Sequence, residues 1–192
     1  QLDIEKYLAE VNAAITDPAE KEKIKQLSAA KDYRNLVAEY QKLDKPIALA
    51  WYATKLAASQ NTADAYVGAG DYNSMLSQSA PDEKVKNFLI INALDCYQKA
   101  VAIDSSNTNN RVKLAAAYME SGGQPMQGVS ILLDIVRKDS TNIPALMMLG
   151  KFGIISGQYD KSIARLEKIL YLQPENSEAL LLLAEAYNGS GN

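Results

Sequence analysis

Apolar residues recur at three- and four-residue spacing along most of this chain, a pattern that predicts amphipathic α-helices. The clearest stretch, residues 143–176, predicts two helices joined by a short turn. The first helix carries the small residue Gly150, which lets a facing helix come close, and Pro174 ends the second because proline cannot continue a helix. The stripe on the second helix consists of Ser162, Ile163, Leu166, Ile169 and Leu170.

The same helix–turn–helix pattern recurs along the chain with a near-constant period. The step from Leu149 and Gly150 to Leu183 and Ala184 is 34 residues (183 − 149), a length typical of stacked helical repeats. We predict repeats at residues 29–61, 62–107, 108–142 and 143–176, and a partial repeat at residues 177–192. The second repeat contains an insertion of about a dozen residues that lengthens its loop or its second helix. Turns are expected near residues 43–46, 77–82, 122–125, 156–158 and 189–191.

Residues 1–28 are predicted to form an N-terminal helical region. Asp17, Pro18 and Glu20 together are a helix-start signal, with an N-cap, a proline in the first turn and a glutamate that reaches back. The last repeat stops at Asn192, just after a turn signal, and the chain starts at Gln1 instead of a methionine. We therefore expect the chain to be a fragment whose incomplete last repeat exposes an apolar face.

The small, aromatic and helix-ending residues of these repeats are placed in a way that resembles the tetratricopeptide-repeat family. The residues that carry the resemblance are Gly150, Gly157, Tyr159, Ser162, Ile163 and Pro174. The resemblance covers residues 29–191 and implies an all-α fold, an α-α superhelix of antiparallel helix pairs with a right-handed twist. The family also implies a scaffold that binds a peptide or a partner helix in a concave groove lined by the first helix of each repeat.

The register of the resemblance selects the side chains that would line this groove. The expected lining is aromatic in its N-terminal half and rich in methionine in its C-terminal half, which suits an apolar partner segment. The residues are Tyr33, Tyr40, Tyr66, Val112, Met119, Met147, Met148, Lys151, Ile154, Leu181 and Leu182. The alternative is that these side chains pack against neighbouring repeats or against a helix that follows. The family's clamp of Lys, Asn and Arg for a C-terminal carboxylate is absent at the matching positions, so we do not expect chaperone-tail binding.

Charge and hydropathy argue against two classes of partner, nucleic acids and the membrane interior. The formal net charge is −3 and the isoelectric point is near 5.1, with scattered basic residues, so we expect no nucleic-acid binding. No apolar run approaches the roughly 20 residues that span a bilayer, so we expect no direct membrane insertion by this chain. Its layout is also similar to bacterial tetratricopeptide-repeat proteins tethered to the cell envelope. That similarity implies the periplasmic side of the envelope, with a signal or anchor removed, and the cytoplasm is the alternative.

The residue inventory argues against an enzyme. The chain has no histidine and a single cysteine, Cys96, which excludes Ser-His-Asp and Cys-His arrangements and nearly all zinc sites. Ser28 and Lys31 have the spacing of some acyl-transfer enzymes but lack the accompanying motifs. Gly68 and Gly70 match only half of a phosphate-binding loop, and no strand precedes them. We predict no catalytic, metal-binding or cofactor-binding residue.

Two function classes follow. In the first, the chain is an interaction scaffold that recruits a protein or peptide segment into an apolar groove. In the second, the chain is a structural subunit of a larger assembly, with or without membrane association. That assembly is a homo-oligomer or a multiprotein complex, and it permanently covers the apolar surfaces of the chain. A monomer that binds an added apolar helix would favour the first class, and a chain that is soluble only as an oligomer would favour the second.

Overall fold

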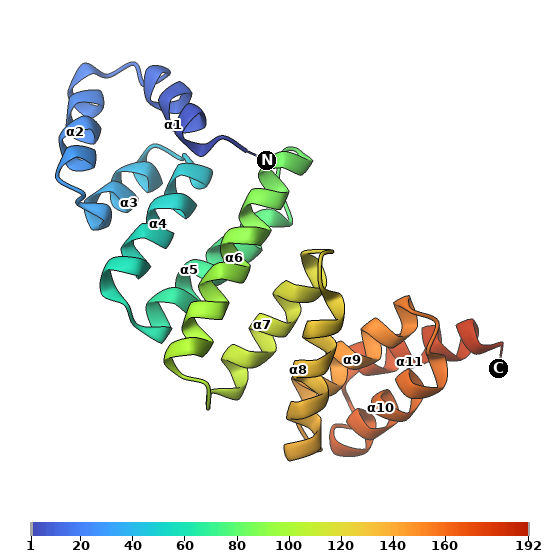
Figure 1. The fold of residues 1–192 in the computed structure, drawn as a ribbon. Helices are drawn as coiled ribbons and strands as arrows, with labels where there is room; N and C mark the ends of the chain where they lie inside the picture. The colour runs from blue at the N-terminus through green and yellow to red at the C-terminus, as the bar shows by residue number, and fades with distance from the viewer. Residues whose placement is uncertain (1, 192) are drawn as a thin grey trace. The chain divides into compact units, whose positions relative to one another are not determined.

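A computed structural model describes residues 2–191, and over that range the chain contains eleven α-helices and no β-strand (Figure 1). The all-α prediction is therefore confirmed for these residues. Gln1 and Asn192, the outer limits of the first and last predicted segments, lie outside the described residues. The helices are α1 (Ile4–Ala13), α2 (Pro18–Ala29), α3 (Tyr33–Lys42), α4 (Pro46–Gln60), α5 (Ala63–Ser77), α6 (Glu83–Ile103), α7 (Thr108–Glu120), α8 (Pro125–Lys138), α9 (Ile143–Ile155), α10 (Tyr159–Leu172) and α11 (Ser177–Ser190).

Short polar side chains start many of these helices. The Asp17 carboxylate accepts the backbone N–H of Ala19 at the start of α2, next to Pro18 in the first turn, as the sequence predicted. Asn142 and Asn176 repeat one cap at an interval of 34 residues (176 − 142): their side-chain oxygens accept the N–H of the residue three positions on, at 3.1 and 2.9 Å. This equivalence of α9 and α11 fixes the register between the two helices.

The helix ends agree with four of the expected turns and differ at the fifth. Breaks separate α3 from α4, α5 from α6, α7 from α8 and α9 from α10 near the expected positions. The turn expected at residues 189–191 instead lies mostly within α11, which continues to Ser190 and is capped by Gly191 at φ 81°. Gly189 serves close packing rather than a turn, because a Cβ added there would lie 2.4 Å from the Tyr159 ring.

The chain divides into two compact units, the first extending to Asn110 and the second beginning at Arg111. In the first unit the insertion lengthens the second helix of its repeat: α6 has 21 residues, whereas α8 and α10 have 14 each. Val85, Phe88 and Leu89 near the start of α6 form an apolar cluster with residues of α4. Leu2, Ile4 and Tyr7 of the N-terminal segment pack against the same cluster. The extra turns of α6 thus give α1 a further contact within the first unit.

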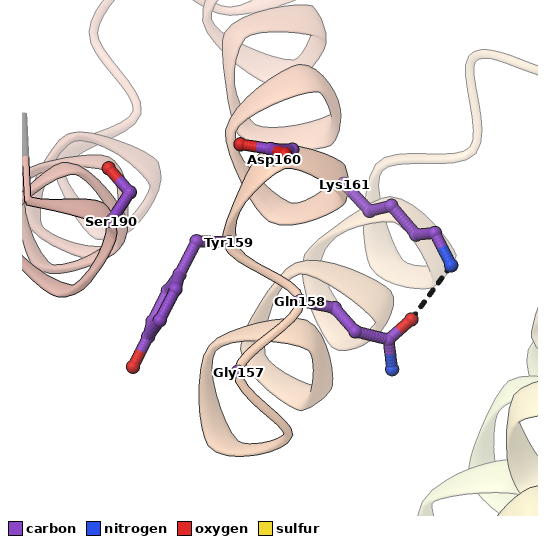
Figure 2. A pocket seen from close by; sticks show the side chains of 6 residues that line it. All are labelled: Gly157, Gln158, Tyr159, Asp160, Lys161 and Ser190. Atoms are coloured by element: carbon purple, nitrogen blue, oxygen red, sulfur yellow. Dashed lines mark hydrogen bonds between the residues drawn. The ribbon is translucent and has the colours of Figure 1, made fainter.

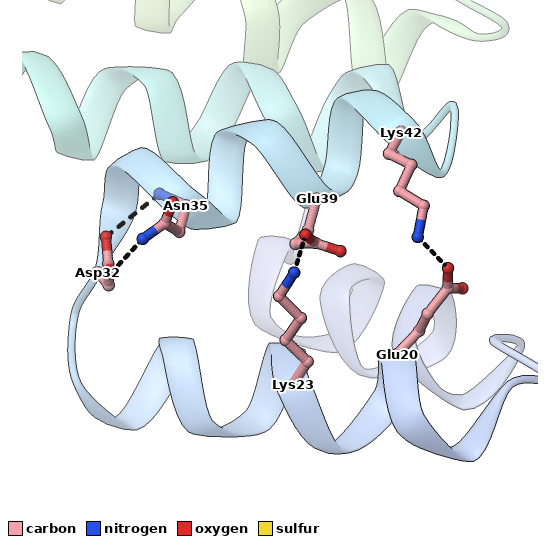
Figure 3. A network of polar contacts seen from close by, with 6 residues as sticks. All are labelled: Glu20, Lys23, Asp32, Asn35, Glu39 and Lys42. Carbon is pink, nitrogen blue, oxygen red and sulfur yellow. Dashed lines mark hydrogen bonds and ion pairs between the residues drawn. The ribbon is translucent and has the colours of Figure 1, made fainter.

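Ion pairs join α2 to α3 in the same unit (Figure 3). Lys42 pairs with Glu20 at 2.6 Å between Nζ and Oε1, and Lys23 pairs with the buried carboxylate of Glu39. The Lys42 pair is exposed on its lysine side, and such pairs contribute little to stability. The Glu39 pair matters more, because removing Lys23 would leave a buried carboxylate without its counter-ion.

Tyr40 lies in the core of the first unit. Its side chain is 0% exposed, stacks on Tyr52 with ring centroids 5.3 Å apart, and donates a hydrogen bond to Asn12 Oδ1 at 2.8 Å. Burial away from water, reinforced by the nearby Tyr52, raises the pKa of Tyr40 to about 12 from an ordinary value of 10.0. The folded state therefore holds the phenolic proton more tightly than the unfolded state does.

We expect this coupling to weaken the fold at high pH. Stabilisation from the Tyr40 proton is complete below the unfolded pKa of 10.0 and is lost as the pH rises through the folded pKa of about 12. Tyr40→Phe should unfold more easily at neutral pH, by about 1 kcal/mol for the lost hydrogen bond, yet should lose less stability over that alkaline window. Urea titrations of both proteins on either side of the window test this, and equal losses would contradict it.

The second unit is built around close helix contacts at glycines. Gly150 of α9 faces Leu166 of α10, and the Ser162 hydroxyl donates to the Gly150 carbonyl oxygen at 2.9 Å. Gly153 is closer still, since a Cβ there would lie 2.1 Å from Ser162 Oγ. In α8, a Cβ on Gly128 would lie 2.4 Å from the backbone oxygen of Ala115. These residues let α8 and α10 approach the helices beside them more closely than larger residues would permit.

Candidate interaction surface

The outward sides of α9 and α11 form a surface that we call the first-helix face. It is defined by Met148, Lys151, Ile154, Ile155, Glu178 and Leu182. Lys151 and Glu178 connect the two helices through an ion pair of 2.5 Å between Nζ and Oε1. Ile155, one turn beyond Lys151, is 83% exposed. The face therefore combines a charged pair at its middle with aliphatic side chains beside it.

The predicted groove residues of the second unit are only partly accessible. Val112, Met119 and Met148 are half-buried against the cluster formed by α7, α8 and α9. Ile154 and Leu182 are half-buried against the cluster formed by α9, α10 and α11. Half-buried aliphatic side chains contribute to the core and still present an apolar edge to a partner. Their participation in binding stays a prediction.

Met147 and Leu181 hold equivalent positions in α9 and α11 but differ sharply in exposure. Met147 is 7% exposed and belongs to the cluster that α9 forms with α10 and α11, whereas Leu181 is 74% exposed. The expectation that Met147 lines an open groove is thus corrected: its side chain is core, because the following helices cover it. Leu181 is open because no described residue covers that position on α11.

The tyrosines expected to line the groove in the first unit are largely core residues. Tyr40 is fully buried, and Tyr66 is 5% exposed in a cluster with small residues of α4, α5 and α6. Tyr33 is half-buried, with its ring centroid 6.4 Å from that of Tyr52. The expectation of an open aromatic lining at Tyr40 and Tyr66 is therefore corrected. Small neighbours such as Ala69 leave room that the Tyr66 ring fills.

The sequence reasoning missed the most exposed aliphatic residue of α9. Ile155 directly precedes the predicted turn and is not among the predicted groove residues. Its position seven residues after Met148 and four after Lys151 places the three on one stripe of the helix. Helical spacing continued to the last residue of the helix would have found it.

A polar hollow lies where the α9–α10 turn meets α11 (Figure 2). Its volume is about 470 Å³, and it is lined by Gly157, Gln158, Tyr159, Asp160, Lys161 and Ser190. Lys161 Nζ donates to Gln158 Oε1 at 2.8 Å, and Ser190 Oγ donates to the Tyr187 carbonyl oxygen at 2.8 Å. Because the sequence contains no histidine, the hollow lacks the base that most often activates a serine for acyl transfer.

The single cysteine is placed for packing rather than reactivity. Cys96 is fully buried and lies 4.0 Å from Thr54 Oγ1. Burial raises the pKa of its thiol to about 11 from 9.0, so little thiolate forms at neutral pH. Between residues 2 and 191 no group of three or more acidic or cysteine side chains is arranged to hold a metal ion. Over the same range, no helix is long and apolar enough to cross a membrane.

Comparison with known proteins bears on the fold. No protein-family model matches the sequence, and no curated protein is significantly similar to it. A crystal structure of MamA aligns over 84% of this chain and 82% of its own, at 17% identity and a TM-score of 0.62. A crystal structure of TTC0263, a thermophilic TPR protein in Thermus thermophilus, aligns over 80% of this chain and 78% of its own, at 16% identity and a TM-score of 0.64.

The chain has a tetratricopeptide-repeat fold. The tetratricopeptide resemblance read from residues such as Gly150 and Ser162 is thereby confirmed at the level of the fold. Those two residues also meet in the structure, where the Ser162 hydroxyl bonds the backbone of Gly150.

Proposed function

We propose that this protein is a non-enzymatic interaction scaffold and that the first-helix face binds an apolar segment of a partner protein. The observation that carries the proposal is the exposure of Ile155 beside the Lys151–Glu178 pair. An aliphatic side chain of that size left in water on a helix face is a feature of binding surfaces when it adjoins other apolar groups. Here Met148 and Ile154 supply the adjoining apolar edge.

The charged pair gives the face a means of selecting partners. Lys151 and Glu178 are both partly exposed, so their ion pair contributes little to stability. At a binding surface the same pair can meet complementary groups of a partner and fix its register. The partner expected is therefore an amphipathic segment whose apolar side chains cover Ile155 and Met148 and whose polar groups meet Lys151 and Glu178.

A structural subunit is the second candidate, and one observation favours it. Leu180 and Leu181 are exposed on α11, while the equivalent Leu146 and Met147 of α9 are buried by the helices that follow. An assembly that permanently covers α11 would bury these leucines in the same way. The two candidates differ in which surface is occupied and in whether the isolated chain is monomeric.

Photo-crosslinking separates these candidates, with p-benzoylphenylalanine placed either at Ile155 or at Tyr171. The two positions are matched in exposure, at 83% and 86%, but Tyr171 lies on the second helix α10. In cells that naturally contain the protein, position 155 should crosslink to one partner protein and position 171 should not. Ile155→Ala with Met148→Ala should weaken that complex by about ten- to hundredfold without changing the helical content.

Other outcomes of the same experiment count against the scaffold. Crosslinks from position 155 only to further copies of the chain, together with sedimentation of a stable oligomer, would favour the structural subunit. Equal crosslinking at Ile155 and Tyr171 would show that exposure alone, rather than the first-helix face, determines the contact.

A further inference from the structure

Another surface of the second unit contains an apolar hollow that is lined in part by two cationic side chains. The hollow has a volume of about 160 Å³ and lies over α9, between α8 and α10. Each helix contributes a stripe at three- and four-residue spacing. The lining residues are Met126, Val129 and Leu133 of α8, Leu149, Phe152 and Gly153 of α9, Gln158 at the N-cap of α10, and Lys161 and Arg165 in the first half of α10.

Gly153 lines this hollow and allows α10 to pack closely on α9. A Cβ at Gly153 would lie 2.1 Å from Ser162 Oγ, so α10 can sit this close to α9 only because the residue is glycine. Met126 and Leu133 on the opposite wall remain exposed. The volume is below the roughly 300–1,000 Å³ of small-molecule pockets, so the hollow has room for one large apolar side chain.

Arg165 is the feature that defines the ligand chemistry. Its guanidinium is half-buried and donates a hydrogen bond to the Leu149 carbonyl oxygen, 3.2 Å from Nη1. No carboxylate of residues 2–191 pairs with it, and desolvation by burial lowers its pKa. A guanidinium has five N–H donors in a fork that matches a carboxylate. Arg165 thus retains donors at a site where water is partly excluded.

The positive charge of the hollow also favours a ligand that carries a carboxylate. Among the described residues, Lys161 and Arg165 are the only charged ones that line the hollow, and none of the lining residues is acidic. Charge-assisted hydrogen bonds to a carboxylate are among the strongest that a half-buried guanidinium can form. A ligand that fits therefore has a large apolar group with a carboxylate close by.

We propose that the hollow between α8 and α10 binds a partner protein segment in which a phenylalanine- or leucine-sized side chain adjoins a carboxylate. The apolar side chain enters between Met126 and Phe152, and the carboxylate accepts hydrogen bonds from the guanidinium of Arg165. Lys161 adds positive charge at the rim. The residues that line this hollow are not those of the first-helix face, so binding here can be tested independently of the function proposed above.

Titration with small peptide analogues, followed by NMR on the full chain, tests the proposal. The probes are N-acetylphenylalanine, with a chain-terminal carboxylate, N-acetyl-aspartyl-phenylalaninamide, with a side-chain carboxylate, and N-acetylphenylalaninamide, with neither. At least one carboxylate probe should shift the amide signals of α8 and α10 and the Nε–H signal of Arg165, with a Kd of about 1 mM. Whichever of the two binds more tightly identifies the source of the carboxylate.

Variants show whether the named residues are responsible. Arg165→Gln should weaken binding of the carboxylate probe by about tenfold or more. Met126→Glu changes an exposed residue at the rim, so the fold should tolerate it while the added carboxylate opposes binding. Lys84→Gln, which removes an exposed charge on α6 far along the chain, is the matched control and should bind as the unchanged protein does.

Several results would overturn the proposal. One is equal binding of N-acetylphenylalaninamide and the carboxylate probes, and another is unchanged binding by both Arg165→Gln and Met126→Glu. The absence of localised shifts at probe concentrations well above the expected Kd would also reject it. So would concentration-dependent shifts of the same signals without any probe, because the occupant would then be a second copy of this chain.

Discussion

Gly128→Ala should destabilise the second unit by about 1–3 kcal/mol, although alanine is normally the better helix former. The added Cβ would lie 2.4 Å from the Ala115 carbonyl oxygen and 2.8 Å from Met119 Cγ. The methionine can turn away, but the carbonyl oxygen belongs to the backbone of α7 and cannot yield without separating the two helices. Overpacking against backbone therefore outweighs the gain in helix propensity.

Gly68→Ala is the matched control, because Gly68 also lies within a helix but has nothing within 4 Å of an added Cβ. This change should stabilise the protein by up to about 1 kcal/mol, as alanine restricts the unfolded chain. Thermal melting should show shifts of opposite sign, with roughly 2–4 °C for each kcal/mol. A stabilising shift for both variants would mean that α7 and α8 are not in the contact described.

Met147→Ala should destabilise the protein by about 2–5 kcal/mol, the range for removing a large buried aliphatic side chain. The same truncation at the equivalent position of α11, Leu181→Ala, should change stability by no more than about 0.5 kcal/mol. The reason is burial alone, since α10 and α11 cover Met147 and nothing described covers Leu181. Urea unfolding of the two variants measures the difference.

The result also bears on binding. If Met147→Ala leaves stability unchanged, the side chain is open and its assignment to a groove regains support. If Leu181→Ala is as damaging as Met147→Ala, α11 is covered in solution, as the structural-subunit alternative requires.

The helical fold could be predicted from local information. Spacing of apolar residues, the Asp17–Pro18 start signal and the position of Pro174 are all short-range signals, and they placed most helix ends correctly. Gly189 failed as a turn signal because its role depends on Tyr159, thirty residues earlier in the chain (189 − 159). A glycine used for close packing and a glycine used for a turn look alike in sequence.

The candidate site was harder to predict because the exposure of a side chain depends on all the helices that pack around it. Met147 and Leu181 occupy equivalent positions in the repeat. Met147 is a core residue because other helices pack on it, whereas Leu181 is on the surface because no described helix does. The place of Tyr40 in the repeat predicts a groove position, yet residues of α1, α2 and α4 pack around its side chain and bury it. No sequence motif marks Arg165. Its role depends on the absence of a carboxylate partner among residues 2–191, which only the fold shows.

The extended α6 has a consequence for how the chain folds as it is made. Ile4 of α1 packs against a cluster that contains Phe88, so this contact joins residues 84 positions apart (88 − 4). At a synthesis rate of about 5–20 residues per second, α6 leaves the ribosome several seconds or more after α1. During that interval α1 can pack on α2 and α3 through Leu8 and Asn12 but lacks its contact with α6. The closing of a long loop makes that contact a late step. In the second unit, each helix packs mainly on its neighbours in sequence and can assemble as it emerges.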